Sequence, residues 1–186
     1  MTGRMAAVFI DNGYFSRVLK RAHGEKRVDY EKFSNRLCGD WQRFRTYFYD
    51  CPPYQGSIPS ETERKRAGDA DRFYYSLLRL SRFEIRLGRL LKTNSNPPFV
   101  QKGVDVLMSV DLARLSWSNK IDKAILVTGD SDFVPAVRAA KDAGVLVEIF
   151  YCPSQPISDE LIHACDDRFP ITEDLINETR MGPRTR

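Results

Sequence analysis

The feature that most constrains the fold of this chain is a set of short, continuous apolar runs separated by segments with helical periodicity. Residues 6–10 (AAVFI), 124–128 (AILVT) and 145–151 (VLVEIFY) are such runs. Their length and composition are typical of strands buried on both faces, as in a parallel sheet. Strands that alternate with helices predict a three-layer α/β/α fold with a mainly parallel central sheet and right-handed crossovers.

The remaining segments fill in this alternation. Residues 43–49 (RFRTYFY) predict a further strand, and alternating apolar residues from 83 to 91 predict a half-exposed strand at a sheet edge. Ser60 and Glu63 have capping-box spacing at the start of a long helix over 61–81. Residues 94–101 (NSNPPFVQ) are expected to form a loop. Other helices are expected around residues 13–23, 30–37, 102–115, 134–143 and 161–165 and near the C-terminus, with a last strand at 169–171.

The size and charge of the chain indicate a single globular domain. With 186 residues, 42% of them hydrophobic and 29% charged, it is long enough to bury a core and is unlike a disordered chain. We expect one domain over residues 1–178, with a charged helical insertion at about 55–82 and a flexible polar tail at 179–186. The net charge is +8 for residues 1–100 and −4 for residues 101–186, which suits a polyanion held by the first half and a cation held by the second.

Targeting signals and metal-binding cysteine motifs are not recognisable in the sequence. The apolar runs are too short to span a bilayer and the N-terminus lacks a long apolar signal core, so we expect a cytoplasmic protein without a membrane partner. The four cysteines lack CxxC spacing and the two histidines are isolated. We therefore expect free thiols and no structural zinc site.

Four acidic residues stand where the chemistry of such a fold is expected. Asp11 follows the first strand, Asp130 and Asp132 follow the strand at 124–128, and Asp105 opens a helix just after Gly103. Ligands bind outside the carboxyl ends of parallel strands, where the strand order reverses. Carboxylates gathered there repel one another unless a cation joins them. Oxygen ligands without His or Cys favour Mg²⁺ or Mn²⁺, which can activate water against a phosphodiester.

Each acid also has a purely structural interpretation. Asp11 and Asp130 stand at helix N-cap positions, and Asp132 and Asp105 stand in first helical turns, where negative charge is favourable. We prefer the site because all four fall in the right places. Asp111 lies six residues beyond Asp105, about 120° around the helix axis. Its carboxylate either contacts and orients the side chains that bind the metal, or is a solvated surface group.

Several polar residues near these acids are candidates for binding substrate. They are Asn12, Tyr14, Lys102 and Ser131. Ser131 as a nucleophile is disfavoured, because no histidine is suitably placed for a triad. The basic run Arg64–Arg66 can contact phosphates, and Tyr54, Tyr74 or Tyr75 can stack on bases, although a solvated helix with ordinary core aromatics explains them equally well.

The same residues resemble the NYN domain, specifically the LabA-like branch of the PIN-like nuclease superfamily. The matching segments are VFIDNGYF (8–15), TYFYD (46–50), KGVDVLMSVDLARL (102–115), AILVTGDSDFVPAVRAAKDAGVLVEIF (124–150) and ACDDRFPIT (164–172). The resemblance implies a PIN-like (Rossmann-like) α/β/α fold, a metal-binding pocket of catalytic acids at Asp11, Asp105, Asp130 and Asp132, and RNA as substrate. The family carries a further acid on the KGVDV helix, which Asp111 matches.

The resemblance leaves three functional hypotheses. The first is a metal-dependent ribonuclease, and the second is a degenerate relative that binds RNA or a regulatory partner without cleaving. The second has support because many relatives carry asparagine where this chain has Tyr14. The third, a phosphatase of the haloacid-dehalogenase type, is disfavoured because its D-x-D motif would need an acid at Gly13. A homodimer through the predicted edge strand at 83–91 is a further expectation.

Overall fold

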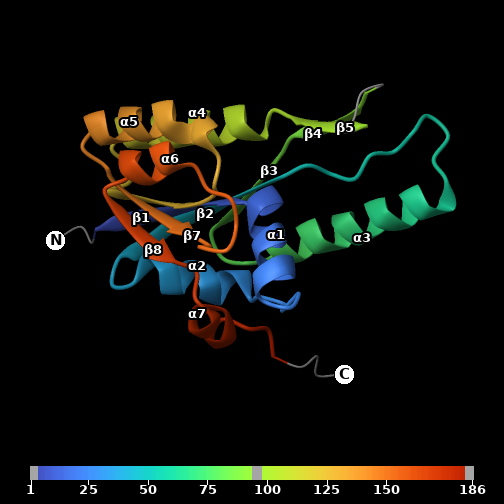
Figure 1. The fold of residues 1–186 in the computed structure, drawn as a ribbon, viewed down its shortest axis with the longest axis horizontal. Coiled ribbons are helices and arrows are strands. Elements are labelled where there is room, and N and C mark those ends of the chain that lie inside the picture. The colour runs from blue at the N-terminus through green and yellow to red at the C-terminus, as the bar shows by residue number, and fades with distance from the viewer. Residues whose placement is uncertain (1–3, 94–97, 183–186) are drawn as a thin grey trace.

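The computed structural model describes residues 4–93 and 98–182, and its strands and helices alternate along the chain (Figure 1). The elements are β1 (Met5–Asp11), α1 (Asn12–Ala22), α2 (Tyr30–Cys38), β2 (Gln42–Asp50), α3 (Glu61–Leu78), β3 (Phe83–Leu87), β4 (Arg89–Lys92), β5 (Phe99–Lys102), α4 (Val104–Trp117), β6 (Lys123–Val127), the 3₁₀ turn η1 (Ser131–Phe133), α5 (Val134–Asp142), β7 (Leu146–Tyr151), α6 (Asp159–Ala164), β8 (Asp167–Pro170) and α7 (Glu173–Glu178).

Six of the strands form one parallel sheet in the order β3-β2-β1-β6-β7-β8. The chain builds outward from β1 to β3 and then returns to place β6 on the other side of β1. The strand order therefore reverses between β1 and β6, which is where ligands bind in such sheets. The three-layer fold with a parallel central sheet is confirmed, and so is the edge position of β3.

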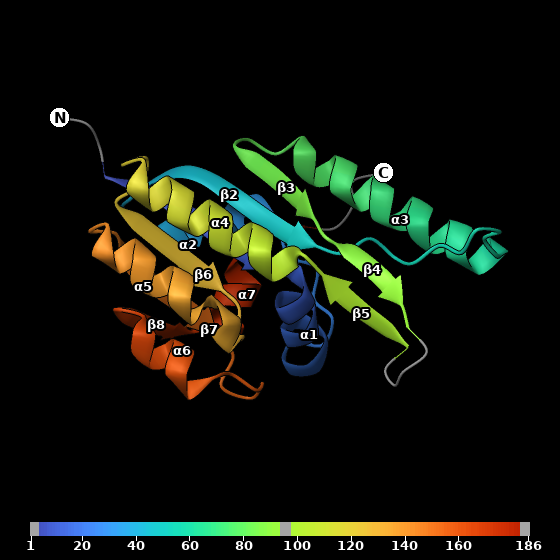
Figure 2. The same ribbon diagram turned by 90° about the horizontal axis from the view of Figure 1, so that it is seen from above.

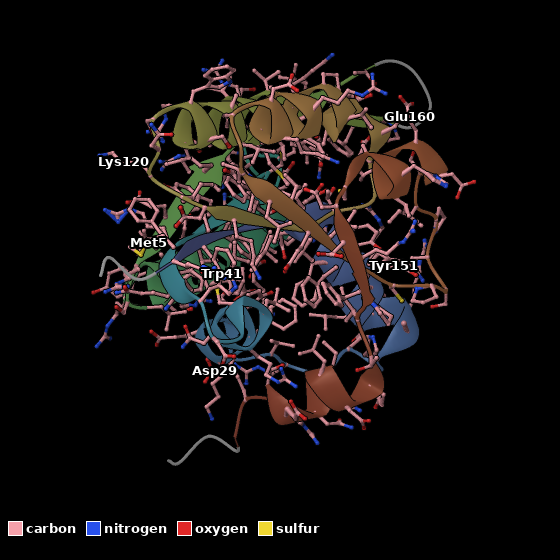
Figure 3. All side chains as sticks on the ribbon, turned by 90° about the vertical axis from the view of Figure 1, so that its left-hand side faces the viewer. Met5, Asp29, Trp41, Lys120, Tyr151 and Glu160 are labelled. Carbon is pink, nitrogen blue, oxygen red and sulfur yellow. The ribbon has the colours of Figure 1, made fainter. Side chains whose placement is uncertain are left out.

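The sheet is buried on both faces, as the continuous apolar runs predict. Alternate residues of each central strand enter different cores, so Phe9 of β1 packs under α4 and α5 while Val8 and Ile10 pack against α1 and α2. Helices α4, α5 and α6 cover one face, and α1, α2, α3 and α7 cover the other (Figures 1 and 2). Side chains fill both spaces between sheet and helices (Figure 3).

The segment from 83 to 102 differs from the expectation in two ways. The strand predicted over 83–91 breaks at Gly88, where an added Cβ would lie 2.7 Å from the carbonyl oxygen of Lys102. Only glycine fits this close approach, and the chain bends there into β4. The loop predicted over 94–101 is wrong for its last residues, because Phe99–Lys102 pairs with β4 in an antiparallel hairpin. Residues 94–97 lie outside the described part of the chain.

The predicted start of the long helix and the predicted end of the domain can be compared with the structure. The capping box at the start of α3 is confirmed, since Ser60 and Glu63 each accept a hydrogen bond from the other's backbone. At the other end, Asp29 N donates to Thr179 O and Met181 N donates to Arg27 O, each at 2.8 Å. Ordered structure thus continues past residue 178, and the tail at 183–186 lies outside the described residues. No helix in residues 4–93 or 98–182 is long and apolar enough to cross a membrane.

A charged pair is buried at the opposite end of the sheet from the carboxyl ends of the strands. Lys123 Nζ lies 2.7 Å from Glu148 Oε1, and both side chains are 8% exposed. The ammonium also lies 4.4 Å from the ring centre of Trp41, which is labelled in Figure 3. Because the two buried charges compensate each other, we expect the pair to be sensitive to removal of either member.

Candidate active site

The side chain of Asp11 is fixed by two hydrogen bonds at the reversal point of the sheet. It caps α1, where its Oδ1 accepts from Tyr14 N at 3.2 Å. Its Oδ2 accepts from the hydroxyl of Thr128 at 3.1 Å, and Thr128 directly follows β6. This second bond crosses from β1 to the chain leaving β6. The carboxylate is therefore held where the two strands separate.

The other three predicted acids lie on the chain around this point. Asp130 caps η1 by accepting from Asp132 N at 3.0 Å, and both side chains are exposed. Asp105 is half-buried in the first turn of α4. The N-cap positions expected for Asp11 and Asp130 are confirmed, and so are the first-turn positions expected for Asp105 and Asp132. Capping and site formation are compatible, because a capping carboxylate keeps oxygen lone pairs beyond those its cap bond uses.

The electrostatics connect the four acids. Burial raises the pKa of Asp105, and the charges of Asp130 and Asp132 raise it further. Burial also raises the pKa of Asp11, against the hydrogen bonds from Tyr14 and Thr128, and Asp105 adds repulsion. Asp105 therefore interacts with each of the other three acids. The charges of the other acids therefore repel Asp105 at this edge of the sheet, and the assignment of the four acids to one site stays a prediction.

Two cavities at this edge contain the acids. One of about 230 Å³ is lined by Asp11 and Asp130. The other, of about 630 Å³, is lined by Asp105 and Asp132. Ser131 contributes to both cavities and is exposed. The arrangement gives a polyanionic or metal-bound ligand access to all four carboxylates from solvent.

The donor atoms fit a hard divalent cation. Among residues 4–93 and 98–182, no three His, Cys, Asp or Glu side chains stand close enough together to hold one ion between them. Mg²⁺ does not require such a cage, because it usually keeps several waters and binds through one or two carboxylates and the phosphates of the substrate. Burial is the main cause that raises the pKa values of Asp11 and Asp105, and repulsion from neighbouring acids, which a cation would offset, adds to it.

We expect Asp105→Asn to stabilise the metal-free protein at pH 7. The pKa of Asp105 is raised on folding. Between the ordinary pKa of an aspartate and this raised pKa, the folded state binds more protons than the unfolded state, so stability is lost as the pH rises through this window. Removing the charge should raise the free energy of unfolding by about 1 kcal/mol. Urea unfolding in EDTA should show this gain at pH 7 and a smaller gain near pH 4. Equal gains at both pH values would contradict the electrostatic cause.

Two of the predicted substrate-binding side chains are engaged within the protein. Asn12 Nδ2 donates to Asp50 Oδ2 at 2.8 Å. Tyr14 is 3% exposed, and its hydroxyl accepts from Cys152 N at 2.9 Å. The ring of Tyr14 packs on the backbone after β6, because a Cβ on Gly129 would lie 2.7 Å from it. Tyr14 lines the smaller cavity, and contact of either residue with substrate stays a prediction.

Lys102 and Asp111 lie apart from the carboxylates. Lys102 is exposed at the end of β5, on the opposite face of the hairpin from Gln101. Asp111 is 7% exposed and accepts hydrogen bonds from the Tyr49 hydroxyl, Arg86 and Arg114 at 2.9 to 3.1 Å. The solvated alternative for Asp111 is therefore wrong. The contacts of its carboxylate tie α4 to β2 and β3.

The structure also adds two residues that the sequence reasoning missed. Asp50 ends β2 beside β1 and accepts from Asn12, from the Tyr74 hydroxyl at 3.0 Å and from Cys51 N at 2.8 Å. Its position at a strand end next to Asp11 was a signal present in the sequence. Arg17 lines the smaller cavity with Asp11. A helical spacing of four residues from Gly13 places it on the same side of α1.

The tyrosines proposed for stacking fall into different environments. Tyr74 is 7% exposed, and its hydroxyl donates to Asp50. Tyr75 is exposed on α3, as are Arg64, Lys65 and Arg66. Tyr54 precedes α3 and packs against Phe99 of the hairpin. Of the three, Tyr74 is placed as a core residue that supports Asp50.

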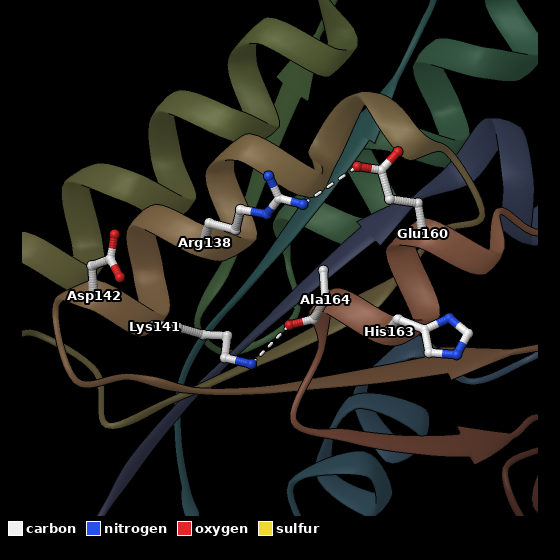
Figure 4. Close-up of a pocket in the computed structure, with 6 residues that line it drawn as sticks. All are labelled: Arg138, Lys141, Asp142, Glu160, His163 and Ala164. Carbon is white, nitrogen blue, oxygen red and sulfur yellow. Dashed lines mark hydrogen bonds and ion pairs between the residues drawn. The ribbon is translucent and has the colours of Figure 1, made fainter.

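A separate cavity of about 330 Å³ lies between α5 and α6 (Figure 4). The basic side chains that line it are already paired. Arg138 is 3.5 Å from Glu160, and Lys141 donates to the carbonyl of Ala164 and lies 2.9 Å from Asp166. An anion entering this cavity would have to displace these partners. The acids at the reversal point therefore remain the candidate site.

Comparison with known proteins bears on the family and the fold of the chain. A family model described as NYN domain matches residues 5–173. The crystal structure of a protein of unknown function from Vibrio parahaemolyticus superposes with a TM-score of 0.65 and 20% sequence identity, covering 92% of this chain and 95% of that one. An uncharacterized protein of Methanocaldococcus jannaschii is 49% identical over 41 residues, which are 22% of this chain and only 17% of that protein. The structural likeness concerns the fold alone.

Proposed function

Because the chain belongs to the NYN domain family, we propose that it is a metal-dependent ribonuclease that hydrolyses phosphodiester bonds at the carboxylates of Asp11, Asp105, Asp130 and Asp132. The NYN family is a PIN-like nuclease family, and PIN-like nucleases generally use divalent metals. The observation that carries the proposal is that Asp11 and Asp130 line one cavity and Asp105 and Asp132 line another, with Ser131 in both. Mg²⁺ or Mn²⁺ fits their oxygen donors.

Each residue has a role that follows from its contacts. A bound divalent ion would lower the pKa of water and neutralise charge on the phosphate. Asp11, fixed by Tyr14 N and Thr128, offers a carboxylate whose direction does not change when substrate arrives. Asp130 lines the same cavity as Asp11, and Asp105 and Asp132 line the second cavity, which also contains Ser131. Arg17 lines the same cavity as Asp11 and can bind a phosphate oxygen.

The charge distribution supports RNA as the polyanion. The first hundred residues carry 19 basic and 11 acidic side chains, and Arg64, Lys65 and Arg66 are exposed on α3. Cations on one part of a nuclease attract the phosphate backbone while acids elsewhere perform chemistry. We also assign the chain to the LabA-like branch on its KGVDV and TGDSDF segments. A cytoplasmic location and a homodimer through β3 remain proposals.

A second candidate is an RNA-binding module of the same fold that does not cleave. Two observations favour it. Tyr14 replaces an asparagine found in many relatives, and its hydroxyl is occupied by Cys152 N. Asn12, the nearest amide, is turned toward Asp50. A residue other than Asn12 or Tyr14 would then have to orient the substrate next to Asp11. The ribonuclease and the binding module differ only in whether the bound RNA is cleaved.

Cleavage of labelled RNA separates these candidates. We expect the purified protein to cleave single-stranded or structured RNA with Mg²⁺ or Mn²⁺ and not with EDTA. The Asp130→Asn variant should lose this cleavage, because it removes one of the charges that face Asp105. Asp142→Asn, which changes an exposed acid at the end of α5, is the matched control and should cleave normally. RNA that is retained but uncut under all metal conditions would favour the binding module.

A further inference from the structure

The β4–β5 hairpin lies beside the acids and has no role in the function proposed so far. It leaves the sheet at the carboxyl ends of the strands and projects past β2 and β3, together with α3 (Figures 1 and 2). Its pairing places Lys92 opposite Phe99 and Leu90 opposite Gln101. Paired residues in an antiparallel ladder share a face, and so do residues two apart along a strand. Phe99 and Gln101 therefore lie on one face of the hairpin.

This face of the hairpin begins at the candidate site. A Cβ on Gly13 would lie 3.1 Å from Asp11 Oδ1, 3.4 Å from Gln101 Oε1 and 3.7 Å from Arg17 Nη1. The Gln101 amide and the Arg17 guanidinium are thus close to the carboxylate of Asp11. Phe99 lies two residues before Gln101 in β5, which separates the two residues by about 7 Å along the strand. A ligand bound at Asp11 would meet Phe99 next along this face.

Phe99 presents an aromatic surface that the fold does not bury. It is 40% exposed. Its ring packs against Tyr54, with ring centres 5.3 Å apart and an angle of 46° between the planes. Tyr54 belongs to the segment between β2 and α3, so the pair joins two elements outside the main sheet. Such a pair, partly open to solvent and close to a phosphodiester-cleaving site, matches the aromatic platforms on which proteins stack bases.

We propose that Phe99 and Tyr54 form a stacking platform for one base of single-stranded RNA. This base lies next to the phosphate held at Asp11, and Gln101 lies between the platform and Asp11. This proposal rests on the proposed function for the identity of that phosphate. Bases of a duplex are already paired and stacked on their neighbours, whereas the splayed bases of a single strand can stack on an aromatic ring. The platform thus makes the site selective for unpaired RNA.

Binding of a fluorescent single-stranded RNA of about ten nucleotides, followed by anisotropy in EDTA, tests the platform without cleavage. We expect Phe99→Ala to weaken binding about tenfold and Phe99→Tyr to bind like the unaltered protein. Leu91→Ala is the matched control, because Leu91 is 47% exposed on the other face of the same hairpin. It should bind normally. A blunt RNA duplex should bind more weakly, with the same affinity for all variants.

Three results would overturn the platform. They are equal binding of the single strand by Phe99→Ala and Leu91→Ala, no binding of the single strand by the unaltered protein, and equal affinity of the unaltered protein for the duplex and the single strand. A parallel assay keeps the proposed function separate. A small chromogenic phosphodiester, too short to reach the hairpin, should be hydrolysed with Mn²⁺ at the same rate by Leu91→Ala and the unaltered protein. No hydrolysis by either would refute the nuclease chemistry, while a tenfold loss of RNA binding would still support the platform.

Discussion

Replacing Asp11 with asparagine is expected to lower metal-dependent cleavage of RNA about a thousandfold. The substitution removes a carboxylate that is fixed at the reversal point of the sheet by Tyr14 N and Thr128. Charge stabilisation at a metal-assisted phosphodiester is worth several kcal/mol, and about 4 kcal/mol corresponds to this factor in rate. Single-turnover cleavage with saturating protein measures the effect on the chemical step.

The fold should tolerate this change, which makes the loss of activity interpretable. Asparagine caps helices about as well as aspartate. Burial raises the pKa of Asp11, which means that the ionised carboxyl is disfavoured in the fold, and asparagine removes this cost. Asp29→Asn is a matched control, since Asp29 caps α2 with nearly the same backbone angles, −77° and 102° against −75° and 104° for Asp11. Normal cleavage by Asp11→Asn, or equal losses in both variants, would refute the assignment of Asp11 to the site.

Replacing Lys123 with methionine is expected to lower the free energy of unfolding by about 3–5 kcal/mol. The substitution leaves the Glu148 carboxylate buried beside β6 with its ion-pair partner removed. It also removes the ammonium packed on the Trp41 ring, a smaller contribution. Urea unfolding at pH 7, with the slope of the transition compared between variants, measures the difference.

The double variant Lys123→Met/Glu148→Leu distinguishes an unpaired charge from a packing defect. Replacing both members of a buried pair by apolar side chains is often neutral or stabilising. The double variant should therefore recover most of the stability that the single variant loses, giving a strong coupling between the two positions. A double variant as unstable as Lys123→Met would mean that shape, and not charge, decides the stability at this end of the sheet.

The sequence predicted the sheet well because the central strands are buried on both faces. Such strands give continuous apolar runs, and those of β1, β6 and β7 were recognisable from composition alone. The hairpin was missed because its four-residue strands are mostly exposed and two prolines stand between them in the sequence. The bend at Gly88 depends on the backbone of Lys102 and the side chain of Val104. Contacts of this kind, between distant segments, have no local pattern.

The candidate site divides in the same way. Asp11 and Asp130 were predicted as site residues because they come at or just after the ends of buried strands, and ligands bind beyond such ends in parallel sheets. Asp105 was found from its place at the start of α4. The roles of Asn12 and Tyr14 could not be predicted, because their partners, Asp50 and Cys152, are brought near only by the packing of other elements. Side-chain direction in a turn is set by these partners and not by the residue type.

The hydrogen bond between Thr128 and Asp11 joins residues 117 positions apart in the chain. Contacts of such long sequence separation form late, because the loop between them must close first. During synthesis, β1, β2 and β3 emerge well before β6. A ribosome-bound chain that ends before β6 would hold Asp11 and Asp105 but neither Thr128 nor Asp130. The side chain of Asp11 therefore lacks its partner Thr128 until β6 and the residue after it have been synthesised.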